Sequence, residues 1–437
     1  MASHRANAIR HSRAANTVPE TPTPDGPQDI THHDVVCPFC ALLCDDLAVR
    51  TRGDRARIVQ NACTRGRAGF ERSPPSAACT IGGKPASLAQ AAKRAARLLA
   101  RARRPLIGGL GTDVDGIREA LALAERCGAI VDHMHANAMA NNLRVLQSRG
   151  WITTTLSELR NRADLVVLVG VSFRDRYQHF FRRFVEPTAA LEPERRAHRR
   201  VYYLGPQAAA PQSGSVPIEI LGCPREGLAA TIGALRAALA GRPAPRHGAP
   251  QRKIAALAAA LRLARYPVFV WAPGQLDQRN GDVVIAQICG LVDALNVDGR
   301  AAGLSLGGDD GGQSAVSTAA WLTGFPLRIS YAGPTLAYDP VNFQSDRLLA
   351  TNAVDLLVWI SGFGPSEPPP SGAPIPTVAI GWPLEGAAVH VPTGTPGVDH
   401  AGRLLRTDTV VSLQLKPVRP TVLPSAAAVL RAIAEAL

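Results

Sequence analysis

The stretch Leu156–Gly170, LSELRNRADLVVLVG, decides the fold class of this chain. A polar segment with helical spacing leads into five consecutive apolar residues, Leu165–Val169, and the run stops at a glycine. A short, unbroken run of Val and Leu is typical of a strand that is buried on both faces of a parallel sheet. We therefore expect an α/β protein whose helices cover both faces of parallel sheets.

The same alternation of helix and strand patterns continues in both directions from this stretch. On the N-terminal side it predicts a helix over 88–101, a strand over 105–109, a helix over 113–127 and a strand over 129–131. On the C-terminal side it predicts strands over 201–204, 268–271, 354–360 and 376–380, and helices over 253–264, 283–295 and 426–437. A Pro-, Gly- and Arg-rich segment, 241–252, indicates a linker.

The length of 437 residues indicates several domains. Residues 1–34 are rich in Arg, Ser, Thr and Pro, which predicts a disordered tail, with a transit peptide over 1–16 as the alternative. Residues 35–84 form a small Cys-rich module. The linker then divides the remainder into an α/β domain over 85–245 and a second α/β domain over 246–437.

The composition limits the partners and the compartment of the protein. A net charge of +13 favours an acidic partner. The chain has no nucleic-acid-binding motif, and aromatic residues do not interleave with most basic runs, so we expect no nucleic acid. An apolar stretch of about 18 residues and a signal sequence are both missing, so we expect no membrane contact and a cytoplasmic protein.

The strongest local motif is a cysteine quartet, Cys37, Cys40, Cys44 and Cys63, with the spacing C-x2-C-x3-C-x18-C. Three thiolates on one loop and a fourth downstream suit a [4Fe–4S] cluster. A structural zinc also accepts four thiolates, and four free buried thiols are the third interpretation. The other cysteines are scattered, which favours small buried hydrophobic residues; they are Cys79, Cys127, Cys223 and Cys289.

Two further polar motifs are candidate metal sites. His133 and His135 follow a predicted strand and would share one face of it, as zinc ligands often do, but no complete ligand set follows them. Asp309 and Asp310 lie between glycine pairs, so they predict a mobile polar loop rather than a cation site.

A glycine-rich stretch and two basic runs are candidate anion sites. The glycines of residues 108–111 follow a predicted strand, but Val114 stands where a dinucleotide-binding motif needs its last glycine, so a tight turn is favoured over a phosphate cradle. The basic runs 174–183 and 195–200 indicate either an anion-binding surface or a solvated face or subunit contact.

Taken in order along residues 35–435, several motifs resemble the B subunit of formylmethanofuran dehydrogenase. They are VCPFCALLCDDL at Val36–Leu47 with Asn61–Cys63, the stretch Leu156–Gly170, WLTGFP at Trp321–Pro326, and TPGVDHAG at Thr395–Gly402 with Arg406–Asp408. That family is similar to the large subunits of molybdopterin formate dehydrogenases. The resemblance implies an Fe–S-type module and two α/β domains, with the cofactor-capping barrel left to a separate subunit.

The resemblance fails at the catalytic positions. Active members place a Cys-His pair at molybdenum or tungsten, and here that pair falls on Ala138 and Met139. The substrate-binding Arg falls on Ala337, and Ser172-Phe173 replace an expected Asn-Pro. Alanine has no ligating group, and a methionine thioether cannot shuttle a proton. The resemblance therefore implies no catalytic residues, no pterin-binding residues and no molybdopterin or tungstopterin.

Degenerate subunits of this kind resemble the B subunit of the bacterial formyltransferase/hydrolase complex, which serves formaldehyde oxidation to formate in methylotrophs. The resemblance implies a non-catalytic scaffold in one-carbon metabolism whose partners are the other subunits, with a methanofuran-type carrier guided by a basic surface. Two alternatives remain open: an active molybdopterin or tungstopterin formylmethanofuran dehydrogenase subunit, and a zinc-binding regulatory module that uses the cysteine quartet.

Overall fold

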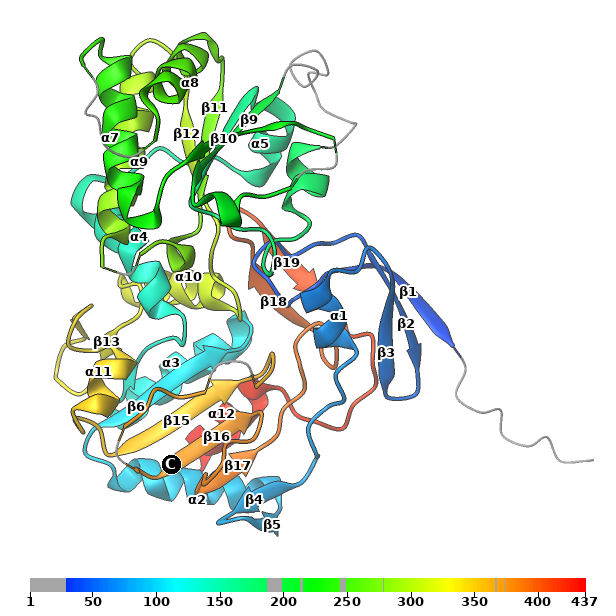
Figure 1. Cartoon of the computed structure of the whole chain (residues 1–437). Coiled ribbons are helices and arrows are strands. Elements are labelled where there is room, and N and C mark those ends of the chain that lie inside the picture. Colours follow the sequence, from blue (N-terminus) through cyan, green and yellow to red (C-terminus); the bar gives the residue numbers. More distant parts are fainter. Residues whose placement is uncertain are drawn as a thin grey trace, which may run out of the picture.

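The structure is a computed structural model that describes residues 29–186, 199–212, 215–243, 249–277, 279–365, 368–372 and 374–437. Figure 1 shows two α/β domains, one above the other, with a small module of antiparallel strands at their side. Both domains are built on largely parallel sheets, so the predicted α/β class is confirmed. The parts of the chain that the structure describes contain no closed barrel.

The lower domain in Figure 1 is built on a nine-stranded sheet. Its strands, in spatial order, are β14 (Ala337–Tyr338), β13 (Ile329–Ser330), β7 (Ile130–Val131), β6 (Pro105–Gly111), β15 (Leu356–Ser361), β16 (Thr377–Gly381), β17 (Val389–Val391), β4 (Cys79–Ile81) and β5 (Lys84–Ala86). The five central strands are parallel, and the two outer strands at each edge are antiparallel to their neighbours.

Helices cover both faces of this sheet. One face packs on α2 (Leu88–Arg101), α3 (Val114–Cys127), α10 (Gly312–Thr323) and α12 (Ala426–Glu435). The other face packs on the short helix α11 (Ser345–Ala350). Helix α2 is held at its start by Ser87, whose hydroxyl accepts from the N–H of Gln90 while the Gln90 side chain accepts from the N–H of Ser87.

The upper domain is built on a five-stranded, fully parallel sheet. Its spatial order is β10 (Ile218–Gly222), β9 (Arg200–Gly205), β8 (Leu165–Val169), β11 (Pro267–Trp271) and β12 (Ala302–Ser305). The helices around it are α4 (Ala136–Arg149), α5 (Leu156–Arg162), α7 (Leu228–Leu239), α8 (Gln251–Leu263) and α9 (Gly281–Leu295). Short helical turns complete it: η1 (Phe181–Val185), η2 (Gln207–Ala209), η3 (Arg225–Gly227) and η4 (Pro273–Gln275).

The position of strand β8 between two hydrophobic cores explains why its sequence is apolar throughout. Val166 and Leu168 point into the core that also contains α5 and the Cys-rich module. Leu165, Val167 and Val169 point into the opposite core, against α7, α8 and α9. Successive side chains alternate between the faces of a strand, so five apolar residues in a row are needed only where both faces are covered.

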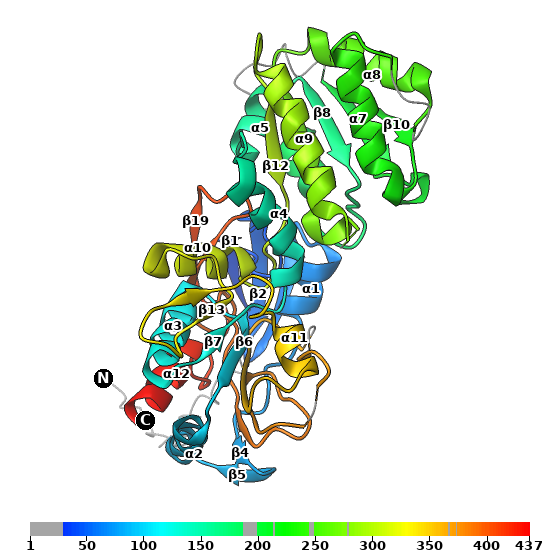
Figure 2. The same ribbon diagram turned by 90° about the vertical axis from the view of Figure 1, so that its left-hand side faces the viewer.

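The predicted division into domains 85–245 and 246–437 is wrong. Strands β6 and β7 from the first segment pair with β15 and β13 from the second, while β8 from the first pairs with β11 from the second. The chain enters the upper domain at α4 and returns at α10, as Figure 2 shows along one side of the molecule. The linker 241–252 joins α7 to α8 inside one domain. Local patterns predict several of these strands but carry no information on which sheet a strand joins.

The Cys-rich module is smaller than predicted and begins earlier. It consists of an antiparallel sheet of β1 (Ile30–Val35), β2 (Leu47–Arg52) and β3 (Arg55–Gln60), followed by α1 (Thr64–Phe70). Residues 30–34 therefore belong to a strand and not to the predicted tail, whose residues 1–28 lie outside the described ranges. Strands β4 and β5 belong to the lower domain because β4 pairs with β17.

A hairpin of β18 (Gly402–Leu405) and β19 (Ser412–Leu415) lies between the Cys-rich module and the domains (Figure 1). Thr407 lies in the turn of this hairpin, and its N–H donates to the carbonyl oxygen of Ala41 in the cysteine loop. Within the described ranges, no helix is long and apolar enough to cross a membrane.

Candidate functional site

The first three cysteines of the quartet lie on one loop between β1 and β2. The loop folds back on itself because the N–H of Cys37 donates to the carbonyl oxygen of Cys44 at 2.7 Å, and the N–H of Leu43 donates to that of Cys40 at 3.0 Å. Cys63 is the N-cap of α1, where its Sγ accepts from the N–H of Gly66 at 3.2 Å. The motif thus places the Sγ atoms of Cys37 and Cys63 beside Gly66, at the start of one helix.

These thiols are shielded from water. Cys37, Cys40 and Cys44 are buried, and Cys63 is half-buried. Burial raises the pKa of Cys44 to about 12, and burial also raises the pKa of Cys37 and of Cys40 above the ordinary value of a thiol. Without a bound cation, the three buried side chains are therefore neutral thiols at pH 7.

The donor set suits a cluster, but its geometry is not that of a ligand set. A Cβ atom added to Gly66 would lie 3.4 Å from the Sγ atoms of both Cys37 and Cys63, so these two thiols flank one small space. Across the described ranges, however, no three Cys, His, Asp or Glu side chains converge in a way that could hold a metal ion. The predicted iron–sulfur or zinc centre stays a prediction.

The remaining cysteines are separate from the quartet. Cys79 is buried in the lower core, and Cys127 packs against that core. Cys223 and Cys289 are buried in the core between the upper sheet and its outer helices. Each acts as a small apolar side chain, as the sequence predicts.

The positions that align with the catalytic residues of active family members are brought only partly together. Ala138 and Met139, in the first turn of α4, line a cavity of about 430 Å³ between the two domains. Ser172 lines the same cavity, while its neighbour Phe173 turns away and stacks on Phe180 at 4.7 Å between ring centroids.

Ala337 does not join them. It pairs with Ser330 in the edge strand β14, its side chain is exposed, and it is not among the described residues that line the cavity. The position aligned with the substrate-binding Arg is therefore apart from the positions aligned with the Cys-His pair.

A buried ionic network lies next to this cavity, and the sequence does not predict it. Asp309 and Asp310 follow β12 and are almost fully buried. Asp310 accepts from Nη2 of Arg65 at 3.2 Å and from Nε2 of His135 at 2.8 Å. Asp309 accepts from Nη1 of Arg176 at 2.9 Å and from the N–H of Ala41 at 2.9 Å. The prediction of a mobile loop is wrong, since these residues join the Cys-rich module to both domains.

Charge and hydrogen bonding fix the protonation states in this network. Burial opposes ionisation of Asp310, but the hydrogen bond from His135 and the charge of Arg65 outweigh it and lower the pKa of Asp310. Nδ1 of His133 accepts the N–H of His135 at 2.9 Å, so its Nε2 carries the proton and donates to the carbonyl oxygen of Asp310 at 3.2 Å. Burial, with the charge of His135, lowers the pKa of His133 to about 3.

The predicted H-x-H pair is consequently not a zinc site. Both ring nitrogens of His133 are used by backbone groups, and Nε2 of His135 is held by Asp310. His133 cannot offer a lone pair to a metal without breaking these contacts, so the two histidines cannot act as a pair of ligands in this arrangement.

The glycines of residues 108–111 lie inside β6 and serve packing against β15. A Cβ added to Gly108 would lie 3.0 Å from the Trp359 ring. Gly109 has a φ of +76°, and its added Cβ would lie 2.5 Å from the carbonyl oxygen of Ile360. The N-terminus of the following helix is already capped by the carboxylate of Asp113, which accepts from the N–H of Gly116 at 3.1 Å. This arrangement favours the structural interpretation over a phosphate cradle.

The described parts of the two basic runs are occupied by internal contacts. Arg182 and Arg183 form ion pairs with Asp45 and Asp46, which follow the cysteine loop. Arg199 is buried and donates to the carbonyl oxygens of Leu159, Arg160, Ala163, Phe184 and Val185. Residues 195–198 lie outside the described ranges. An anion surface built on Arg182, Arg183 and Arg199 would require these contacts to break.

These observations define a class of protein: two interleaved α/β domains that carry a cysteine-loop module, with a cavity at their junction. No family model matches the chain. The B subunit of the formyltransferase/hydrolase complex Fhc of Methylorubrum extorquens is 29% identical over 337 residues, which cover 75% of this chain and 88% of that protein. The B subunit of the tungsten-containing formylmethanofuran dehydrogenase 2 of Methanococcus maripaludis is 25% identical over 403 residues, covering 86% of this chain and 92% of that protein.

A solved structure agrees with these relatives. In the crystal structure of the formyltransferase/hydrolase complex FhcABCD from Methylorubrum extorquens with methylofuran, one chain matches with a TM-score of 0.70 and 28% identity, over 82% of this chain and 98% of that one. The predicted resemblance to the B subunit of formylmethanofuran dehydrogenase, and in particular to the B subunit of the formyltransferase/hydrolase complex, is confirmed.

Proposed function

We propose that the chain is a non-catalytic B subunit of a cytoplasmic formyltransferase/hydrolase complex in the conversion of formaldehyde to formate. The similarity to the Fhc B subunit over three quarters of the chain supports membership in such a complex. The fold resembles that of a chain solved inside the assembled FhcABCD complex, which supports the same role. By this proposal its partners are the counterparts of the other subunits.

The observation that carries the non-catalytic role is the lining of the interdomain cavity. Ala138 and Met139 occupy it where the resemblance to active dehydrogenases implies a metal-binding Cys and a proton-handling His. A methyl group and a thioether provide neither a strong ligand nor a proton carrier. His135 lines the same cavity, but its Nε2 is already hydrogen-bonded to the carboxylate of Asp310.

We further propose that Cys37, Cys40, Cys44 and Cys63 hold a [4Fe–4S] cluster with a structural role, and that the chain binds no molybdopterin or tungstopterin. The burial of three thiols and the hydrogen bond from Gly66 to Cys63 support a site that is protected and oriented. Loading requires a rearrangement of the loop, because the thiols do not yet converge. A zinc ion would need the same rearrangement.

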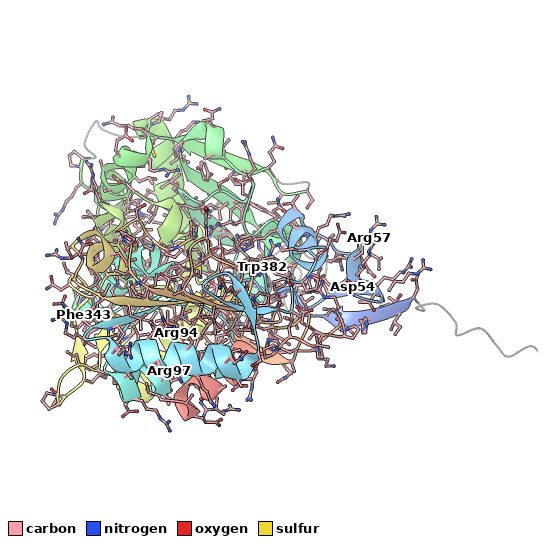
Figure 3. The ribbon with its side chains drawn as sticks, turned by 90° about the horizontal axis from the view of Figure 1, so that it is seen from below. Asp54, Arg57, Arg94, Arg97, Phe343 and Trp382 are labelled. Carbon is pink, nitrogen blue, oxygen red and sulfur yellow. The ribbon has the colours of Figure 1, made fainter. Side chains whose placement is uncertain are left out.

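A methanofuran-type carrier is part of the proposal, since the related complex was solved with methylofuran. A basic surface that could guide it is the outer side of α2, whereas Arg182, Arg183 and Arg199 of the two basic runs are engaged internally. Four basic side chains of α2 form no ion pair within the described ranges, and Figure 3 shows two of them, Arg94 and Arg97, on this helix. The four are Lys93, Arg94, Arg97 and Arg101.

The test is co-expression of the chain with the counterparts of the other subunits of the FhcABCD complex. We expect that Met139→Ala and Ala138→Ser leave the formyl transfer and hydrolysis rates of the assembled complex unchanged, and that omission of the chain prevents assembly. A fully assembled Met139→Ala complex that has lost turnover would contradict the scaffold role. Near-stoichiometric molybdenum or tungsten in the purified complex would support the active-dehydrogenase alternative instead.

A further inference from the structure

The C-terminal end of α10 exposes two large apolar side chains that the fold does not use. Trp321 is 65% exposed and Leu322 is 57% exposed, although neighbouring residues of this helix such as Ala315 and Ala319 are fully buried. Large exposed apolar groups that gather on one surface mark an interaction site more often than chance placement does. Trp in particular is enriched among the residues that dominate binding energy at protein interfaces.

Other exposed apolar side chains gather around Trp321. Trp321 and Leu146 line one cavity of about 410 Å³, together with Trp151, Thr153 and Thr409. In the sequence, Ile152 lies between Trp151 and Thr153 and is 44% exposed. Val410 follows Thr409 and is 63% exposed. Helices α4 and α10, the start of the upper domain and the β18–β19 turn all contribute to this patch.

Several polar groups that line the cavity already have partners. The Asn142 amide accepts from Nε1 of Trp271 and donates to the hydroxyl of Ser305. The hydroxyl of Thr407 donates to the carbonyl oxygen of Ser305, and the carboxylate of Asp408 accepts from Arg406. A ligand in this cavity would therefore be held mainly by burial of apolar groups.

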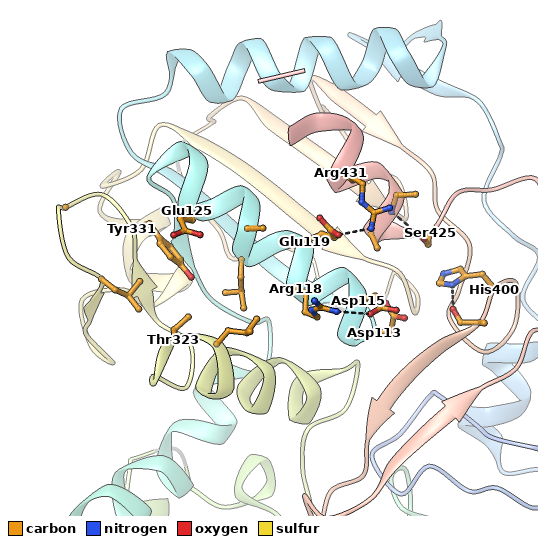
Figure 4. Close-up of a pocket in the computed structure, with 18 of the residues that line it drawn as sticks. Asp113, Asp115, Arg118, Glu119, Glu125, Thr323, Tyr331, His400, Ser425 and Arg431 are labelled. Atoms are coloured by element: carbon orange, nitrogen blue, oxygen red, sulfur yellow. Dashed lines mark hydrogen bonds and ion pairs between the residues drawn. The ribbon is translucent and has the colours of Figure 1, made fainter. Parts of the chain in front are cut away.

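On the other side of α10 lies a groove with the opposite character. Leu322 lines this groove, of about 1260 Å³, which runs between α3, α10 and α12 (Figure 4). Its walls carry four carboxylates and two guanidinium groups, in a chain whose net charge is +13. The carboxylates of Asp115 and Glu119 are paired with Arg118 and Arg431.

Glu125 distinguishes this groove from an internally neutral surface. Within the described ranges its side chain forms no ion pair and no hydrogen bond, and Figure 4 shows it near Tyr331 at the end of the groove that α10 borders. A partner that places a Lys or Arg here gains an ion pair without displacing an existing one.

We propose that the C-terminal end of α10 is a docking surface for a segment of another subunit that crosses it, with a large apolar side chain in the cavity beside Trp321 and a basic residue in the groove that Leu322 and Glu125 line. This inference rests on the proposed membership in a formyltransferase/hydrolase complex and identifies the surface by which the chain would bind another subunit. The apolar side chain would enter the cavity beside Trp321, and the basic residue would face Glu125. Charge complementarity selects a basic residue, since the carboxylate of Glu125 forms no ion pair within the described ranges while Asp115 and Glu119 are already paired.

The test uses the complex co-expressed with the counterparts of the other FhcABCD subunits, analysed by native mass spectrometry and by affinity measurement with the purified chain. We expect Trp321→Asp to weaken association at least about tenfold, as loss of a central aromatic anchor does. Glu125→Lys should weaken association about threefold and reduce its dependence on salt. The matched control is Leu263→Asp on α8, a residue that is 79% exposed and should leave association unchanged.

The outcomes separate this inference from the proposed function. If the unaltered chain joins none of the subunits, the proposed function fails. If the unaltered chain assembles and folded Trp321→Asp assembles with equal affinity, only the docking surface is wrong. A monodisperse dimer of the isolated chain that Trp321→Asp converts to a monomer would assign the surface to a second copy and overturn the proposal. The proposal would also be overturned if removal of residues 1–28 made Trp321 more accessible to acrylamide quenching, because the N-terminal segment would then be what covers the surface.

Discussion

Nε2 of His135 lies 2.8 Å from Oδ2 of Asp310, so the start of α4 is tied directly to the segment that precedes α10. The same carboxylate accepts from Arg65 of the Cys-rich module at 3.2 Å. One buried side chain thus connects the module to the two places where the chain passes between its α/β domains. This position makes Asp310 a contact point between the Cys-rich module and both α/β domains.

Removal of the negative charge of Asp310 should destabilise the folded chain. We expect Asp310→Asn to lower the free energy of unfolding by about 3 kcal/mol, because it leaves Arg65 without its nearest counter-charge in a buried site. Chemical denaturation followed by circular dichroism measures the change. The control is Asp293→Asn, which breaks the exposed ion pair with Arg149 and should cost at most about 1 kcal/mol. Equal losses of unfolding free energy in the two variants would show that the buried network stabilises the fold no more than an exposed ion pair does.

Acid should destabilise the protein through His133. Its pKa is lowered from 6.5 to about 3 in the folded chain, so below pH 6.5 the unfolded chain binds a proton that the folded chain does not. The stability is fully present above pH 6.5 and is lost as the pH falls toward 3. At pH 5 the loss from this group is about 2 kcal/mol.

The pH effect is measured as the slope of unfolding free energy against pH between 6.5 and 4. We expect His133→Asn to reduce that slope by close to one proton, while His33→Gln, on the exposed part of β1, leaves it unchanged. A slope that is the same in the protein and in His133→Asn would mean that His133 is already protonated in the folded state.

The cysteine loop gives a prediction that separates ligands from structural thiols. We expect Cys40→Ser to reduce iron in anaerobically purified protein from about four atoms per chain to background, as expected for loss of a cluster ligand. Cys289→Ser, in a buried core position away from the quartet, should retain the metal. Since the pKa of Cys40 is raised, metal uptake by the apo-protein should accelerate with rising pH. Zinc alone would assign the quartet to a structural zinc site, and no metal in either protein would mean that the loop holds free thiols.

The sequence predicts local structure well here and long-range assembly poorly. Strand β8 is predictable because both of its faces are apolar, and the proximity of Cys37, Cys40 and Cys44 follows from their spacing within eight residues. Helix α4 escapes prediction because its sequence, ANAMANNLRVLQSR, is rich in Asn, which has a low helix propensity, and has only a narrow apolar face.

The buried network shows what the sequence could not convey. The glycines around Asp309 and Asp310 suggest flexibility, yet the partners that immobilise Asp310 lie 245 and 175 residues away along the chain. A signal was present, however. In a chain with a strong excess of arginine, adjacent acidic pairs at 45–46 and 309–310 are the natural counter-charges for arginines that the fold buries.

A pair of glycines tests the structural role assigned to β6. Gly109 combines a φ of +76° with a Cβ position only 2.5 Å from the carbonyl oxygen of Ile360. We expect Gly109→Ala to destabilise the protein by about 2 kcal/mol or more, since it adds left-handed strain and a clash with the neighbouring strand. Gly233, inside α7, is the matched control, because its Cβ position has no described atom within 4 Å. Gly233→Ala should stabilise by about 0.5–1 kcal/mol through its higher helix propensity. Thermal unfolding of both variants decides the matter: a tolerated Gly109→Ala would remove the packing explanation and make the glycine stretch a candidate anion site again.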